Sequence, residues 1–216
     1  MLHLPNATPP GTPVIVEVKE LTVNDDERAA IRRFDDTKVA VWGWGPPGRR
    51  IRQKIEDAKA QLKPPIGGTC PAVLLLYDAR PVTVALLHSY DVMVAMYGLE
   101  TINLHVPENG GHRVTLGRRT FGAGGKLKPG IHTFLSAVCV LRRNAGGELH
   151  LDVYDNAFAT HRLPIEQLGT LSNITLYTLP PGNEGEFGWV RVEDPAADQL
   201  TSGSSGRSRH GPSCGE

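Results

Sequence analysis

The chain has 216 residues and no apolar run close to the roughly 20 residues that a membrane-spanning helix needs. Its first residues have neither the basic start nor the apolar stretch of a signal peptide, so we expect a cytoplasmic protein with no membrane partner. Cysteine is scarce, and Cys70, Cys139 and Cys214 are too far apart to form a paired zinc-binding spacing. Such scattered cysteines are typical of reduced thiols.

Acidic residues are missing from the first 16 positions, and Glu17 is the first carboxylate of the chain. The formal net charge is zero, with 23 basic and 23 acidic residues. These charges are segregated, because residues 49–63 carry six bases and two acids, and residues 113–143 carry seven bases and no acid. Overall neutrality therefore does not exclude a phosphate-bearing partner.

The composition is that of a globular protein, with 40% hydrophobic and 21% charged residues. A chain of this length can bury a core without disulfide bonds. We expect an irregular lead over residues 1–13, an α/β domain over residues 14–168, a C-terminal extension with possible strands over residues 169–194, and a disordered tail over residues 195–216.

A short β-branched run begins at Val14 and predicts a strand with one buried side. The alternation of a strand places Glu17 and Lys19 on the same face as Ile15, and Val14, Val16 and Val18 on the opposite face. Residues 23–37 are mostly charged and predict a surface loop or a short helix capped near Asn24 or Asp25.

Residues 49–63 have the clearest helical pattern in the chain, and Pro64 and Pro65 should end the helix. Its apolar stripe is formed by Ile51, Ile55, Ala58 and Leu62. Lys54 and Gln61 lie together along one edge of this stripe. After the helix, residues 71–77 form a continuous apolar run, which predicts a strand buried on both faces.

The rest of the chain shows shorter patterns of secondary structure. We expect a helix at 89–97, a strand at 101–106, a long loop or hairpin at 107–130, a strand pair at 131–141 and 149–154, and weaker strands within 171–192.

The sharpest chemical feature is the pair Glu17-x-Lys19, because a carboxylate and an ammonium two residues apart point to the same side of a strand. Metal-assisted hydrolysis of phosphodiesters uses such a pair, with the carboxylate on Mg²⁺ and the lysine beside the attacking water. The alternative is an exposed ion pair that contributes little to stability, because such a pair has the same spacing.

The order of the segments is more specific than this pair alone. Glu17-Val18-Lys19-Glu20 is followed by the basic helix, by the apolar run 71–77, and then by residues 95–98, 121–126, 136–141 and 154–159. Over residues 14–168 this order resembles the PD-(D/E)XK nuclease superfamily, and more narrowly a family of uncharacterised bacterial proteins related to those nucleases.

The resemblance implies a restriction-endonuclease-like α/β fold, a mixed sheet flanked by helices, here without the usual N-terminal helix and strand. It also implies that Glu17 is a metal ligand, that Lys19 is the signature lysine, and that Gln61 lies beside them in a site for Mg²⁺. Lys54 would lie on the same helix near the site. The alternative for Lys54 and Gln61 is that they are polar residues bordering a buried face.

One departure from the superfamily pattern is the missing aspartate, which a preceding strand usually supplies as a second metal ligand. Four explanations are open. Either the sequence starts too late or a partner supplies the second ligand. Otherwise a later acid such as Glu20, Asp25 or Asp78 takes the place of the aspartate, or catalysis has been lost. We favour a late start or a degenerate enzyme, because a single carboxylate is a poor site for Mg²⁺.

The basic block after residue 112 offers candidate contacts to nucleic-acid phosphates. Arg118, Arg119 and Lys126 belong to it, and such contacts provide affinity without reading sequence. An ordinary solvated loop is the alternative. The first hypothesis is therefore a Mg²⁺-dependent nuclease acting on DNA, with RNA and a homo-oligomer left open. The second is a non-catalytic module on the same scaffold that binds nucleic acid or protein.

Overall fold

The structure is a computed structural model. It describes residues 11–37, 46–66, 70–81, 87–105, 115–143, 146–164, 168, 172–179 and 189–192. The expected tail over residues 195–216 lies outside the described residues, as does most of the expected lead over residues 1–13. No helix within these ranges is both long enough and apolar enough to span a bilayer.

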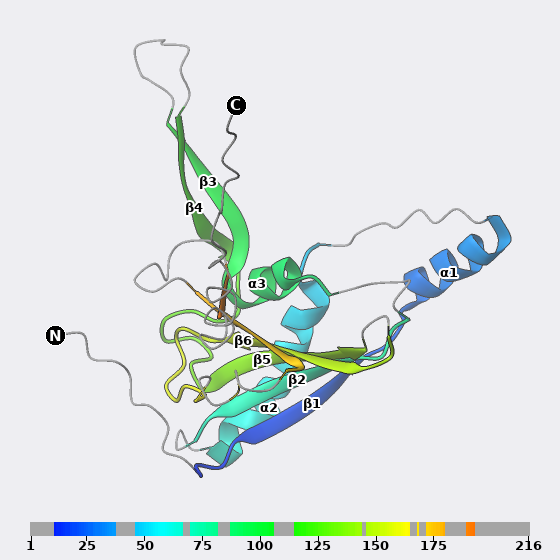
Figure 1. The fold of residues 1–216 in the computed structure, drawn as a ribbon. Coiled ribbons are helices and arrows are strands. Elements are labelled where there is room, and N and C mark those ends of the chain that lie inside the picture. Colours follow the sequence, from blue (N-terminus) through cyan, green and yellow to red (C-terminus); the bar gives the residue numbers. More distant parts are fainter. Residues whose placement is uncertain are drawn as a thin grey trace, which may run out of the picture.

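The described helices and strands are arranged around a six-stranded mixed sheet (Figure 1). In order, the elements are β1 (Ile15–Leu21), α1 (Asp25–Thr37), α2 (Arg49–Ile66), β2 (Ala72–Asp78), α3 (Ser89–Tyr97), β3 (Gly98–His105), β4 (Thr115–Gly124), β5 (Leu135–Arg143), β6 (Leu149–Asp155), β7 (Ile174–Thr178) and β8 (Val190–Val192).

Six of these strands form the main sheet, in the order β1-β2-β5-β6-β7-β8. β1, β2 and β5 are parallel, β6 is antiparallel to β5, β7 is parallel to β6, and β8 is antiparallel to β7. The expected α/β class with a mixed sheet flanked by helices is confirmed. β7 and β8, from the expected C-terminal extension, continue the sheet that begins with β1.

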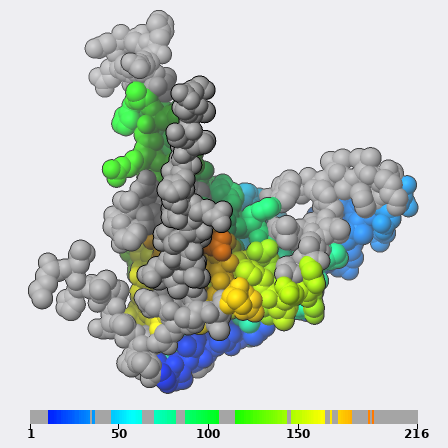
Figure 2. All heavy atoms as spheres, in the orientation of Figure 1, coloured from blue at the N-terminus to red at the C-terminus, as the bar shows by residue number. Residues whose placement is uncertain are grey.

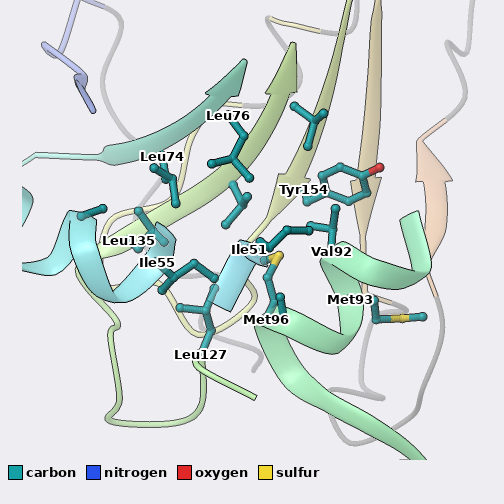
Figure 3. Packing of buried hydrophobic residues seen from close by; sticks show 14 of the residues in the cluster. Ile51, Ile55, Leu74, Leu76, Val92, Met93, Met96, Leu127, Leu135 and Tyr154 are labelled. Atoms are coloured by element: carbon teal, nitrogen blue, oxygen red, sulfur yellow. The ribbon is translucent and has the colours of Figure 1, made fainter. Parts of the chain in front are cut away.

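The core lies between the sheet and the helices α2 and α3 (Figure 3). The predicted apolar stripe of α2 is buried, with Ile51, Ile55, Ala58 and Leu62 each 1% exposed. It meets side chains of β2 and β5 such as Leu74, which is fully buried. The predicted helical end at residue 63 is wrong by three residues, because α2 continues to Ile66.

Of the loop or short helix expected over residues 23–37, capped near Asn24 or Asp25, the structure has the helix α1, and Asn24 forms its cap. The Asn24 side chain accepts a hydrogen bond from the backbone N–H of Glu27 at 2.8 Å, and the Glu27 carboxylate accepts one from the backbone N–H of Asn24 at 2.9 Å. This capping box satisfies two backbone donors at the helix start. The cap therefore fixes where the chain leaves β1 and becomes helical.

The orientation of β1 differs from what hydropathy suggests. The side chains of Val14, Val16 and Val18 are exposed, at 40%, 49% and 58%. Glu17 and Lys19 are partly buried on the opposite face, which is the one that packs toward α2. The charged pair therefore lies on the packed side of the strand, because pairing with β2 puts Glu17 beside Leu74 and Lys19 beside Leu76.

β3 and β4 form a separate two-stranded sheet that stands out from the main body (Figures 1 and 2). β4 lies within the segment 107–130, for which we expect a long loop or hairpin, but its partner β3 precedes that segment and overlaps the strand expected at 101–106. Gly98 joins α3 directly to β3 with a φ of 112°, and a Cβ there would lie 2.5 Å from the carbonyl oxygen of Gly122. Only glycine fits this turn without displacing the backbone.

The position of the core predicts that two leucine substitutions differ in their effect on the free energy of unfolding. Leu74→Ala should lower the free energy of unfolding by about 2–5 kcal/mol, because it leaves a cavity under α2. Leu116→Ala on the hairpin should change it by less than about 0.5 kcal/mol, since that side chain is 75% exposed. Urea titration followed by circular dichroism measures both. Equal losses would contradict this location of the core.

Candidate functional site

Lys19 is the centre of the candidate site. Its ammonium group lies 2.8 Å from Oε1 of Glu17 on the same strand, and it donates a hydrogen bond of 2.6 Å to Oε1 of Gln61 on α2. Lys19 thus contacts both of the residues that the resemblance groups with it, although Gln61 is 42 positions from Lys19 in the chain.

The local fold explains this contact. The alternation of β1 turns Glu17 and Lys19 toward α2, while the buried stripe of α2 leaves Gln61 at its margin, next to the buried Leu62. The side chains of Lys19 and Glu17 keep 19% and 23% of their surface exposed. Solvent and a ligand therefore have access to the group.

The contacts leave Lys19 with capacity for one more acceptor. A lysine ammonium has three donors, and two of them are directed at Glu17 and Gln61. The contacts with Glu17 and Gln61 together hold the flexible lysine side chain in one orientation. The third N–H can bind a water molecule or a phosphate oxygen.

Mg²⁺ does not fit the described residues. This ion needs near-octahedral oxygen ligands and is usually held by one or two carboxylates with several waters. Glu17 provides one carboxylate, and its Oε1 is already in contact with Lys19. Within the described ranges, no three His, Cys, Asp or Glu side chains are grouped so that they could hold a metal ion.

None of the three later acids named as substitutes joins Glu17. Glu20 is exposed on the opposite face of β1. Asp25 is on α1, 3.4 Å from Arg28, with a side chain that is 98% exposed. Asp78 is the last residue of β2 and lies on the same face of the sheet as Lys19, but both of its oxygens accept hydrogen bonds from Arg80, at 2.7 and 2.8 Å.

Asp78 belongs instead to an ion-pair network at the end of β2. Arg80 also contacts Glu27 at 3.0 Å, and Glu27 contacts Arg50 on α2 at 3.1 Å. Burial by itself would raise the pKa of Glu27, but the hydrogen bonds from Asn24 and Arg80 and the charge of Arg50 outweigh it and lower the pKa. This network ties α1 and α2 to the sheet.

The predicted phosphate contacts are not gathered around Lys19. Lys54 is half-buried on α2. Arg118 and Arg119 are exposed on β4, which projects away from β1 (Figure 1), and Arg119 lies 3.1 Å from Glu100. Lys126 lies 2.7 Å from Glu56, whose pKa is lowered mainly by this hydrogen bond. The charges of Arg119 and Lys126 are therefore largely compensated within the chain.

Sequence reasoning missed a polar cluster on β6. Asp152 is buried, and its Oδ2 accepts a hydrogen bond from Arg142 at 2.9 Å. Nε2 of His150 lies 3.3 Å from the other oxygen of Asp152 and 2.9 Å from Oγ1 of Thr175. The alternating pattern His150-x-Asp152-x-Tyr154 was a signal that could have revealed it.

This cluster does not have the geometry of a catalytic triad. A triad uses one ring nitrogen of histidine for the carboxylate and the other for the hydroxyl. Here a single nitrogen of His150 faces both Asp152 and Thr175. The contacts join β5, β6 and β7, so they stabilise the sheet.

Two of the three cysteines, Cys70 and Cys139, lie within the described residues. Cys70 and Cys139 are free and buried, as expected for reduced thiols. Burial raises the pKa of the Cys139 thiol to about 12, which disfavours the reactive thiolate at neutral pH.

Comparison of the chain with protein-family models, with curated proteins and with solved structures finds no match.

The ion-pair network predicts that the stability contributed by Glu27 depends on pH. Because the folded pKa of Glu27 is below its ordinary value of 4.5, its contribution to stability is present at neutral pH and is lost as the pH falls through the folded pKa. Glu27→Gln should cost about 1–3 kcal/mol at pH 7.

The difference between wild type and Glu27→Gln should shrink below pH 4.5 in urea titrations. Asp36→Asn, at an exposed position of the same helix, serves as the control and should change stability by less than about 0.5 kcal/mol. A constant difference from pH 7 to pH 3 would contradict the role of Glu27.

Proposed function

We propose that this chain is a nuclease-like protein that binds nucleic acid, and that Lys19 contacts a backbone phosphate. The observation that carries the proposal is the contact of Lys19 with both Glu17 and Gln61. The same three residues are the ones that the resemblance to PD-(D/E)XK nucleases assigns to a phosphodiester site. DNA is the expected partner, and RNA offers the same phosphate chemistry.

The neighbouring helix supports this role for Lys19. Gln61 and Lys54 are seven residues apart on α2, so they lie on one side of the helix about two turns apart. Lys54 therefore offers a positive charge, beyond the neutral Glu17–Lys19 pair, to a phosphate backbone that follows this side of α2.

Binding without hydrolysis is the form of the proposal that the described carboxylates favour. Cleavage through Mg²⁺ requires ligands that Glu17 does not provide alone, so the role that we assign to Glu17 is to orient Lys19 through their ion pair. The Mg²⁺-dependent nuclease of the first hypothesis, with Glu17 on the metal, stays a prediction that the cleavage experiment below tests.

Lys19→Gln should weaken binding to a fluorescent DNA duplex about tenfold, which corresponds to one lost charge-assisted hydrogen bond. It should also reduce the salt dependence of binding by about one phosphate contact. Lys59→Gln is a matched control, because Lys59 is exposed on α2 away from Gln61. Fluorescence anisotropy at several salt concentrations measures both variants.

Equal affinities of wild type and Lys19→Gln would refute the proposed site. If Arg118→Gln abolished binding while Lys19→Gln retained it, the nucleic acid would lie on the β3–β4 hairpin instead. Far-ultraviolet circular dichroism of each variant shows that a loss of affinity is not a loss of fold.

A plasmid assay tests hydrolysis separately. With Mg²⁺, wild-type protein should cleave supercoiled DNA no faster than Glu17→Ala, because a single carboxylate does not hold the ion. Agarose electrophoresis measures the nicked and linear products. Cleavage by wild type that Glu17→Ala and Lys19→Ala both lack would establish the catalytic hypothesis and overturn the non-hydrolytic one.

A further inference from the structure

The outer edge of β1 is an unpaired sheet edge among the described strands, since β1 pairs only with β2 there. The backbone N–H of Ile15 and the carbonyl of Leu21 are bonded toward β2. In a strand the intervening residues point the opposite way, so the backbone groups of Val16, Val18 and Glu20 face outward. Figure 2 shows β1, in dark blue, along the lower rim of the molecule.

Such an edge offers its backbone groups to another strand. The strand is seven residues long, and three exposed valines border it on one face. Valine favours strand pairing, because its branched side chain packs against the residue opposite. The edge therefore has the hydrogen-bonding groups and the side chains that strand addition uses.

We propose that the occupant of this edge is β1 of a second copy, paired antiparallel in a symmetric dimer centred on Val18. In this register Val18 lies opposite the same residue of the second copy, and Ile15 lies opposite Leu21. Glu17 lies opposite Lys19 in both halves of the pairing. Each carboxylate thus meets two ammonium groups, one from each copy, so in the dimer the second copy takes the third N–H of Lys19 that a phosphate would otherwise bind.

The charges exclude two of the other symmetric registers. A pairing centred on Glu17 or on Lys19 would place like charges directly opposite each other, which is destabilising. The register centred on Val18 is also the one that pairs all seven residues from Ile15 to Leu21.

The backbone geometry agrees with the charge pattern. Because Val16, Val18 and Glu20 point their N–H and C=O groups outward, they form the hydrogen-bonded pairs of the new ladder. Glu17 and Lys19 then form non-hydrogen-bonded pairs, in which opposite side chains approach most closely. The ion pairs therefore fall at the positions where they gain most.

The interface is narrow, so we expect weak association. One strand pair buries less surface than the 1,200 Å² or so that is typical of stable complexes. The dimer should consequently form with a dissociation constant on the order of micromolar or weaker.

Sedimentation velocity of the full chain over a range of concentrations tests the pairing. The apparent mass of the wild-type protein should increase with concentration, from the chain mass of 23.4 kDa toward twice that value. Glu17→Lys alone and Lys19→Glu alone should each remain monomeric, because like charges then face each other in both halves of the pairing.

Two complementary combinations should restore the dimer. An equimolar mixture of Glu17→Lys and Lys19→Glu should form a heterodimer, since every opposing pair then has opposite charges. The double variant Glu17→Lys with Lys19→Glu in one chain should again form a homodimer for the same reason. Circular dichroism of each variant checks that the fold is retained.

Restored association in the mixture would be difficult to attribute to misfolding, because two damaged proteins do not repair each other. Wild type that stays at the monomer mass at every concentration overturns the proposal. So does a single variant that still forms a dimer, or a mixture that does not associate. These measurements contain no nucleic acid, so their outcome is independent of the binding proposed for Lys19.

Discussion

The packing of β2 and β5 beneath α2 and α3 is the constraint on which the rest of the structure depends. Leu74 and Leu76 must face the helices, and the parallel register with β1 then carries Glu17 and Lys19 to the same side. A strand has only two faces, so a shift of one residue would move both charges to the other side. The charged pair therefore takes its position from the hydrophobic core beside it.

This arrangement also explains why one short strand serves several roles. The inner face of β1 brings Lys19 to Gln61, its outer face exposes three valines, and its edge leaves backbone groups without a strand partner among the described residues. A charge that points inward at a sheet edge also discourages unspecific strand addition. In the pairing that we propose, the same charges are complementary in the register centred on Val18.

Much of the fold could be predicted from local patterns. The stripe from Ile51 to Leu62, the apolar run of β2 and the cap at Asn24 follow from periodicity and hydrogen-bonding chemistry within a few residues. The contact of Lys19 with Gln61 required two pieces of information, the shared face on β1 and the helix edge on α2. The polar cluster around Asp152 was missed because its partners Arg142 and Thr175 come from neighbouring strands.

The sequence by itself determined the α/β class, the buried helix face and the local concentration of basic residues. Only the tertiary structure decided which face of β1 is packed, and that Asp78 and Lys126 are paired with Arg80 and Glu56. The physical reason is that alternation in a strand defines two faces without choosing between them. Packing against a helix makes that choice, and the charges of Asp78 and Lys126 are balanced by whichever side chains the packing brings near.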